Sequence, residues 1–112
     1  EDQKETTTFD DFQKMDIRVS TIRAAEKVAK TKKLLKLTVD TGIDKREIVS
    51  GIAEYYTPEE LVGKQVLVLV NLEPRELKGI LSRGMILMAQ DASGKLRLLQ
   101  PDDQTNPGAT VG

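Results

Sequence analysis

Alternation of apolar and polar residues is the main pattern in the central part of the chain. Residues 16–23 place Ile17 and Val19 on one face, with polar side chains between them. Residues 35–40 alternate as strictly, and residues 46–51 form a third such segment. Because side chains of a strand point to opposite faces in turn, these segments predict β-strands with one buried face.

Three further segments predict strands over residues 65–72, 82–90 and 95–99. Within them, residues 66–70 and 85–89 have no polar side at all. A strand of a small antiparallel sheet normally keeps one wet face. Either the helix and loops of the chain cover the second face of these strands, or a second subunit covers it.

Two short helices are predicted by their capping residues. Thr57 is a good N-cap, Pro58 takes the first helical position, and Glu60 completes a capping box. A similar pattern that begins at Thr8 predicts a second short helix over about 9–14.

Short, evenly spaced strands around one central helix predict an all-β fold. A helix between the third and fourth strands favours an OB-fold Greek-key barrel, here with short helices and terminal extensions. Polar residues 1–8 are predicted to be a linker or tag remnant, and residues 9–112 the barrel domain. The tail, residues 101–112, is predicted to be a loop.

Composition excludes most enzyme classes. The 112 residues include no cysteine and no histidine, so the chain has no thiolate nucleophile, no imidazole base and no zinc site built from these residues. No phosphate-binding or calcium-binding loop motif occurs. We therefore expect no catalytic residue, metal, cofactor or small-molecule substrate. With no signal-peptide pattern and no long apolar run, we expect a cytoplasmic protein without membrane contact.

The net charge of −1 conceals a segregation of charge along the chain. Residues 1–16 carry −4 and residues 101–112 carry −2, whereas residues 17–100 carry +5. Residues 23–36 alone contain six bases and one acid. A basic centre predicts a polyanionic partner, although lysines that only solvate a surface produce the same count.

Two basic stretches supply candidates for contacts to phosphate. The first enters the strand at 35–40, and its lysines are Lys30, Lys32, Lys33 and, on the polar face of that strand, Lys36. The second, residues 71–85, combines three bases with two neutral hydrogen-bonding groups: Arg75, Lys78, Arg83, Asn71 and Ser82. Alternatively, the second stretch is an ordinary turn that Asn71 and Ser82 only tie down.

The few aromatic residues favour structured RNA over a single strand. The chain has two Phe and two Tyr residues, and none lies on a predicted strand. OB folds that bind single strands stack bases on such aromatics. Binding should therefore depend on phosphates, sugars and folded shape, which suits structured RNA.

Five segments in the same order and spacing resemble the tRNA-binding OB-fold domain family. They are DIRV at 16–19, LLKLTVDTG at 34–42, IVSGIA at 48–53, NLEPR at 71–75 and GILSRGMIL at 79–87. This family occurs at the C-terminus of bacterial methionyl-tRNA synthetase, in free-standing bacterial tRNA-binding proteins and in the endothelial monocyte-activating polypeptide. The resemblance covers residues 9–112.

The resemblance implies an OB barrel that binds tRNA by shape, with little sequence preference. For the bacterial members it also implies a homodimer built by terminal extensions and barrel flanks. RNA-contacting positions of the family carry over onto Lys33, Asn71, Arg75, Ser82 and Met85. Charge and position add Arg18, Lys32, Lys36, Lys78 and Arg83.

The expected function is a non-catalytic tRNA-binding and dimerisation domain of a methionyl-tRNA synthetase, whose parent activity is the ATP-dependent ligation of methionine to tRNA. The alternatives are a free-standing dimeric tRNA-binding protein and an export-related peptide chaperone of the same fold. An exposed apolar groove would favour the chaperone, and a basic loop cluster favours RNA. Residues 28–33 (VAKTKK) depart from the usual His-Pro-Asn-Ala-Asp-Lys of the family, and Lys32 replaces its acid.

Overall fold

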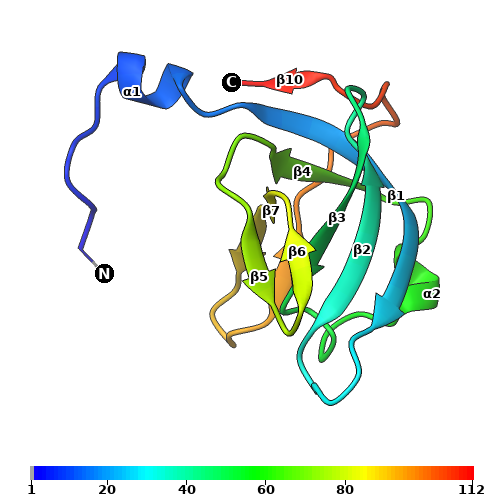
Figure 1. The fold of residues 1–112 in the computed structure, drawn as a ribbon. Coiled ribbons are helices and arrows are strands. Elements are labelled where there is room, and N and C mark those ends of the chain that lie inside the picture. Colours follow the sequence, from blue (N-terminus) through cyan, green and yellow to red (C-terminus); the bar gives the residue numbers. More distant parts are fainter. Residues whose placement is uncertain (1) are drawn as a thin grey trace.

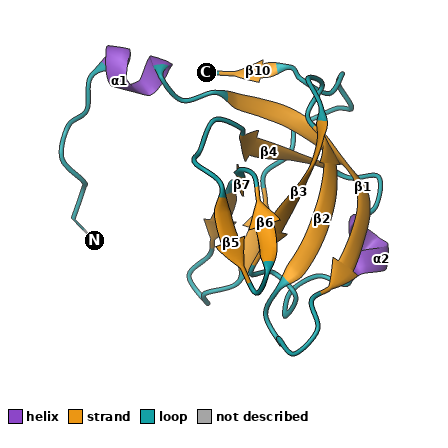
Figure 2. Ribbon diagram, viewed as in Figure 1, coloured by secondary structure: helices purple, strands orange, loops and turns teal. Residues whose placement is uncertain are grey.

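The computed structural model describes residues 2–112, and its main element is a strongly curled antiparallel sheet with the strand order β3-β2-β1-β4-β7 (Figure 1). Two small hairpins, β5–β6 and β8–β9, and two short helices complete the barrel (Figure 2). In chain order the elements are α1 (Phe9–Gln13), β1 (Ile17–Lys27), β2 (Leu35–Asp40), β3 (Lys45–Ser50), α2 (Pro58–Leu61), β4 (Gln65–Leu69), β5 (Arg75–Leu77), β6 (Ile80–Ser82), β7 (Met85–Ile86), β8 (Met88–Gln90), β9 (Leu96–Leu98) and β10 (Thr110–Val111). The predicted OB-type barrel is confirmed.

Strand β1 curls the sheet because it pairs with two neighbours in succession. Its first half, residues 17–21, pairs with β4, and its second half, residues 21–27, pairs with β2. The register shifts between Ile22 and Ala24, where the strand bends from one partner to the other. The strand therefore continues four residues beyond the predicted end at Arg23.

Inward-facing residues of the strands form a single core, as the alternation predicts. The fully buried members from the sheet are Ile22, Leu35, Leu37, Val39, Ile48, Val66 and Val68. Helix α2 adds Leu61, and its capping box is formed: the Thr57 hydroxyl oxygen accepts from the Glu60 amide at 3.3 Å. The Glu60 carboxylate in turn accepts from the Thr57 amide at 3.1 Å. Both predicted helices are confirmed.

Residues 71–90 differ from the sequence prediction. A hairpin, β5–β6, replaces the expected loop, and Lys78 and Gly79 both adopt positive φ, as a two-residue hairpin turn of type I′ requires. Gly84, with φ of 127°, then interrupts the strand expected over 82–90. A β-carbon on Gly84 would lie 3.0 Å from the Leu69 carbonyl oxygen, so the chain bends where only glycine fits.

The predicted loop at 101–112 contains a short strand, β10, which pairs with the start of β1. The buried Gln65 amide holds this tail, because its Nε2 donates to the Thr105 carbonyl at 2.6 Å and its Oε1 accepts from the Thr105 N–H at 3.0 Å. Two paired residues are too short to leave a periodic signal, so only tertiary contacts reveal this strand.

The strands without a polar side do not leave a large apolar face open. Of their outward residues, Leu67, Leu69 and Leu87 are half-buried within the chain, and Met85 is 46% exposed. Large exposed apolar side chains gather in two places: on the N-terminal segment, where Phe12 is 40% and Met15 49% exposed, and around the β5–β6 hairpin, where Leu72, Leu81 and Met85 are exposed. No helix within residues 2–112 has the length and apolar character that a membrane crossing requires.

Candidate nucleic-acid interface

The β5–β6 hairpin lies along the edge of β3 that is not paired with β2, and a small pocket forms there. The amide of Val49, on β3, donates to the Ser82 hydroxyl oxygen at 2.9 Å. Arg75 faces Ser82 across the hairpin. Around them is a pocket of about 70 Å³, lined by Arg75, Ser82 and the acidic Glu73 together with apolar side chains: Val49, Leu72, Leu77 and Met85. The structure thus brings together three predicted contact residues, Arg75, Ser82 and Met85.

Ser82 also has a structural role. Its side chain is only 4% exposed, and the bond to Val49 satisfies a buried backbone donor. We expect Ser82→Ala to lower the free energy of unfolding by about 1–3 kcal/mol, because a buried N–H loses its acceptor. Urea denaturation measures this change. Ser50→Ala is the control, since the Ser50 hydroxyl makes no hydrogen bond within residues 2–112. Equal stability of the two variants would contradict the prediction.

Asn71 connects the end of β4 to the N-terminal segment. Its Oδ1 accepts from the Asp16 amide at 2.9 Å, and its Nδ2 donates to the Lys14 carbonyl at 2.7 Å. Both polar atoms of the amide are therefore engaged within the chain. This geometry agrees with the alternative in which Asn71 holds the backbone of the N-terminal segment in place. Direct contact between Asn71 and RNA stays a prediction.

Two of the predicted cations are held by carboxylates in the sheet. Lys36 Nζ lies 2.7 Å from Glu26 Oε1 and 3.4 Å from Glu47 Oε2. These hydrogen bonds, the one to Glu26 first, raise the pKa of Lys36 above its ordinary value. Arg18 pairs with Asp16 at 2.9 Å and lies at the start of β1, whereas the lysine loop follows the end of that strand. Arg18 is therefore not grouped with the other candidates.

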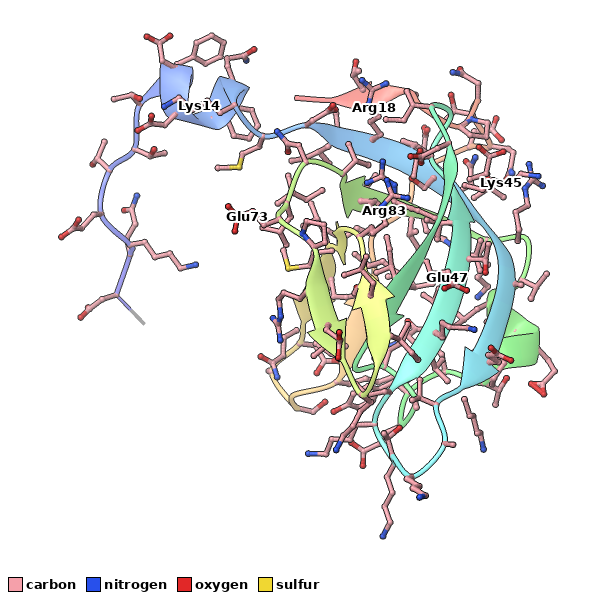
Figure 3. All side chains as sticks on the ribbon, in the orientation of Figure 1. Lys14, Arg18, Lys45, Glu47, Glu73 and Arg83 are labelled. Carbon is pink, nitrogen blue, oxygen red and sulfur yellow. The ribbon has the colours of Figure 1, made fainter. Side chains whose placement is uncertain are left out.

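Arg83 is neither fully paired nor free, because it belongs to a small group of charged side chains around Asp44 (Figure 3). Its guanidinium lies 3.6 Å from Asp44 and remains partly exposed. Arg46, which the sequence analysis missed, is buried beside Asp44 at 2.8 Å and donates to the carbonyls of Val70 and Arg83. Its hydrogen bond to Asp44 lowers the pKa of that carboxyl. Arg46 thus positions the backbone at Arg83. In the sequence, the only indication of this role is a charged residue at a strand position that faces inward, opposite Val39.

The remaining predicted cations are exposed and make no ion pair within residues 2–112. They are Lys32, Lys33, Arg75 and Lys78, and Lys30 of the same loop shares this property. The backbone of the loop is held at its end, where the Lys33 carbonyl accepts from the Ala53 amide at 3.0 Å. The loop at 30–33 and the β5–β6 hairpin therefore carry five exposed positive charges that have no ion-pair partner within residues 2–112.

Backbone conformation gives an independent indication at the tips of these supports. Lys30 and Lys78 are the two non-glycine residues with positive φ in the described part of the chain, at 63° and 52°. Such a conformation is unfavourable for a residue with a β-carbon. Strain of this kind concentrates at functional sites, and here it places a lysine at each tip.

A second, larger hollow lies between the two chain termini. This cleft of about 560 Å³ is lined by residues of α1, the start of β1 and β10, among them Phe12, Met15, Ile17, Arg18 and Val111. Figure 1 shows α1 and β10 beside the first residues of β1, while the loop between β1 and β2 lies at the other end of β1. The cleft and the free lysines are therefore separate surfaces.

Comparison with known proteins identifies the family. A family model described as "Putative tRNA binding domain" matches residues 17–110, which include the hairpin, the pocket and the lysine loop. The chain belongs to this tRNA-binding domain family. The tRNA-binding assignment from the five segments is thereby confirmed, and tRNA is the partner that the family indicates.

Relatives of the tRNA-binding domain include methionine–tRNA ligases. The methionine–tRNA ligase of Cytophaga hutchinsonii is 64% identical over 109 residues, which are 97% of this chain and 16% of that protein. The chain thus spans about a sixth of the length of the curated relatives it matches.

Solved structures show the same barrel in a MetRS-related protein and in a chaperone. A MetRS-related protein from Pyrococcus horikoshii has a TM-score of 0.91 and 40% identity, and the match covers 97% of this chain and 100% of that one. The chaperone CsaA from Bacillus anthracis str. Ames has a TM-score of 0.88 and 28% identity, with 96% and 100% covered. The fold alone therefore does not separate an RNA-binding function from a chaperone function.

Proposed function

We propose that this domain binds tRNA by its folded shape, without catalysis, and that it does so as a dimeric appendage of a cytoplasmic methionyl-tRNA synthetase. The parent ligase activity would reside in the remaining five-sixths of such a protein. The observation that carries the proposal is the set of five unpaired cations on the loop and the hairpin, beside the pocket at Ser82. A phosphate backbone neutralised by such cations releases counterions, which favours binding.

Shape selectivity follows from where the free charges lie. They project from the loop at 30–33 and from the hairpin, while the strand cations Lys36 and Arg18 are paired. No aromatic side chain lines the pocket beside the hairpin, so a stacking platform for single-stranded bases is absent from it. Two separated basic projections suit the phosphates of a folded, A-form RNA more than those of a flexible strand.

The strained tip of the hairpin predicts a trade-off between stability and binding. Asn tolerates positive φ better than Lys, so Lys78→Asn should raise the free energy of unfolding by roughly 0.5–1 kcal/mol. The same change removes a phosphate contact and should make the log–log salt slope for tRNA shallower by about one. Thermal unfolding and titration at several salt concentrations measure the two effects. A variant that gains stability and keeps the full slope would remove the hairpin tip from the interface.

Support for a dimer comes from the terminal segments and not from the two-sided apolar strands. Phe12 and Met15 are exposed beside the cleft that Ile17 and Val111 line. Large exposed apolar side chains that gather at one place usually mark an interaction surface. A second copy of this chain, joined through these terminal segments, would cover them.

The experiment that separates tRNA binding from chaperone activity is a competition between the two ligands. We expect unlabelled bulk tRNA to displace a fluorescent tRNA from the protein, and an unfolded polypeptide to leave the fluorescence anisotropy unchanged. Displacement by the unfolded polypeptide at comparable concentrations, with weak binding of tRNA, would favour the chaperone function instead.

A further inference from the structure

Lys36 lies on the strand next to β3, the strand that contacts the β5–β6 hairpin, although its ammonium is ion-paired with two carboxylates. On β2 it is directly opposite Val49 of β3, and the Val49 amide is bonded to Ser82 of the hairpin. On its other side Lys36 is directly opposite Glu26 of β1. Adjacent strands are about 4.8 Å apart, so an RNA seated on the hairpin would pass within reach of this lysine.

The two carboxylates around Lys36 change the sign of this part of the surface. Glu26 Oε1 lies 2.7 Å and Glu47 Oε2 3.4 Å from Lys36 Nζ. Glu47 is two residues from Val49 on β3, opposite Thr38, and therefore lies on the same outer face as Lys36. One ammonium between two carboxylates leaves a net charge of −1. Figure 3 shows Glu47 on the front of the β2–β3 face, below Arg83.

Burial does not explain the pair of acids. Both carboxylate side chains are largely solvated, 63% exposed for Glu26 and 48% for Glu47. Exposed ion pairs contribute little to stability, typically 0–1 kcal/mol, so a single acid would have sufficed to place the lysine. A surplus negative charge beside an RNA-binding surface instead disfavours phosphate at that place.

We propose that Glu26 and Glu47 are specificity determinants that keep RNA phosphates off the part of the outer face of β1, β2 and β3 that surrounds Lys36. They withhold the Lys36 ammonium from RNA and surround it with excess negative charge. Binding is then limited to the loop at 30–33 and the β5–β6 hairpin, whose fixed positions suit the fixed phosphate spacing of a folded RNA. This inference rests on the proposed tRNA-binding function and extends it to the discrimination between folded and single-stranded RNA.

The test is a double variant, Glu26→Gln with Glu47→Gln, which removes the charges and keeps the shape of the side chains. We expect the affinity for tRNA to rise about tenfold, as for one added charged hydrogen bond. The log–log salt slope should become steeper by about one, because Lys36 is free to contact a phosphate. Affinity for a single-stranded RNA of equal length should rise more than affinity for tRNA, so selectivity falls.

Two further variants separate local from long-range effects. Glu59→Gln with Asp102→Asn changes the net charge equally; neither carboxylate makes an ion pair within residues 2–112. We expect this control to leave the salt slope and the selectivity as in the wild type. Adding Lys36→Met to the Glu26→Gln, Glu47→Gln protein should return the salt slope to its original value.

Equal gains in the double variant and the charge-matched control would overturn the inference, as would a steeper slope that persists without Lys36. In both of these outcomes the unmodified protein still binds tRNA, so the proposed function stands. Absence of tRNA binding by the unmodified protein is a different result, and it would reject the proposed function together with this inference.

Discussion

Reversal of two charges in the loop at 30–33, by Lys32→Glu with Lys33→Glu, is expected to lower the affinity for tRNA about 100-fold. Both lysines are exposed and unpaired within the described chain, so each is available for a phosphate contact. Loss of a hydrogen bond to a charged group typically costs about 1.5–3 kcal/mol, or roughly tenfold or more in affinity. The log–log salt slope should also become shallower by about two. Fluorescence anisotropy at several salt concentrations measures both quantities.

A charge-matched control is available at the other end of the sheet. Lys45 begins β3, opposite Asp40, whereas the lysine loop adjoins the end where Leu35 pairs with Ser50. Lys45→Glu with Lys64→Glu should therefore keep the salt slope and lower the affinity only a few-fold, through the net charge alone. Equal losses in the two double variants would mean that the loop makes no specific contribution.

Introduction of aspartate at Phe12 and Met15 is expected to convert a dimer into a monomer. Removal of a Phe or Met side chain from water contributes roughly 1.5–3 kcal/mol, and a symmetric dimer would bury four such side chains. The double change should raise the dissociation constant of the dimer by about a thousandfold or more. Light scattering at micromolar concentration should give about twice 12.4 kDa for the original protein and about 12.4 kDa for the variant.

The matched control for this variant changes apolar residues that are equally exposed elsewhere. Ile43 and Val62 are 57% and 51% exposed, and neither lines the cleft between the termini. Ile43→Asp with Val62→Asp should leave the mass of the dimer unchanged. An original protein that stays monomeric at this concentration would contradict the dimer and, with it, the bivalent contact with RNA that a dimer allows.

Local patterns in the sequence predicted the parts of the fold that depend on local physics. Strict alternation over 35–40 corresponds to a strand with Leu35, Leu37 and Val39 inside, and the capping box at Thr57 and Glu60 is formed. The division of residues 82–90 and the strand at 110–111 were not predicted. The first depends on the close approach of Gly84 to the Leu69 carbonyl, and the second on the hydrogen bond between the Gln65 amide and Thr105. Both are contacts between residues far apart in the chain.

Only part of the candidate site could be predicted from the sequence, because contacts between residues far apart in the chain decide the rest. Charge counts and the family resemblance select basic residues, but they do not show which of these have a partner in the fold. By charge and position alone, Lys36 and Arg83 are as good candidates as Lys32. Strand register brings Glu26 beside Lys36, and the turn before β3 brings Asp44 beside Arg83. Only the three-dimensional arrangement therefore separates free cations from paired ones.

The proposed function requires that tRNA contacts the free cations of the loop at 30–33 and of the β5–β6 hairpin. Backbone amide chemical shifts recorded during titration of isotope-labelled protein with tRNA test it most directly. We expect shifts at residues 30–33, at 75–82 and at Met85, with little change in α2 and in the outer face of β1 at Glu26. Shifts confined to the cleft at Phe12, Ile17 and Val111, with the loop and hairpin unaffected, would contradict it.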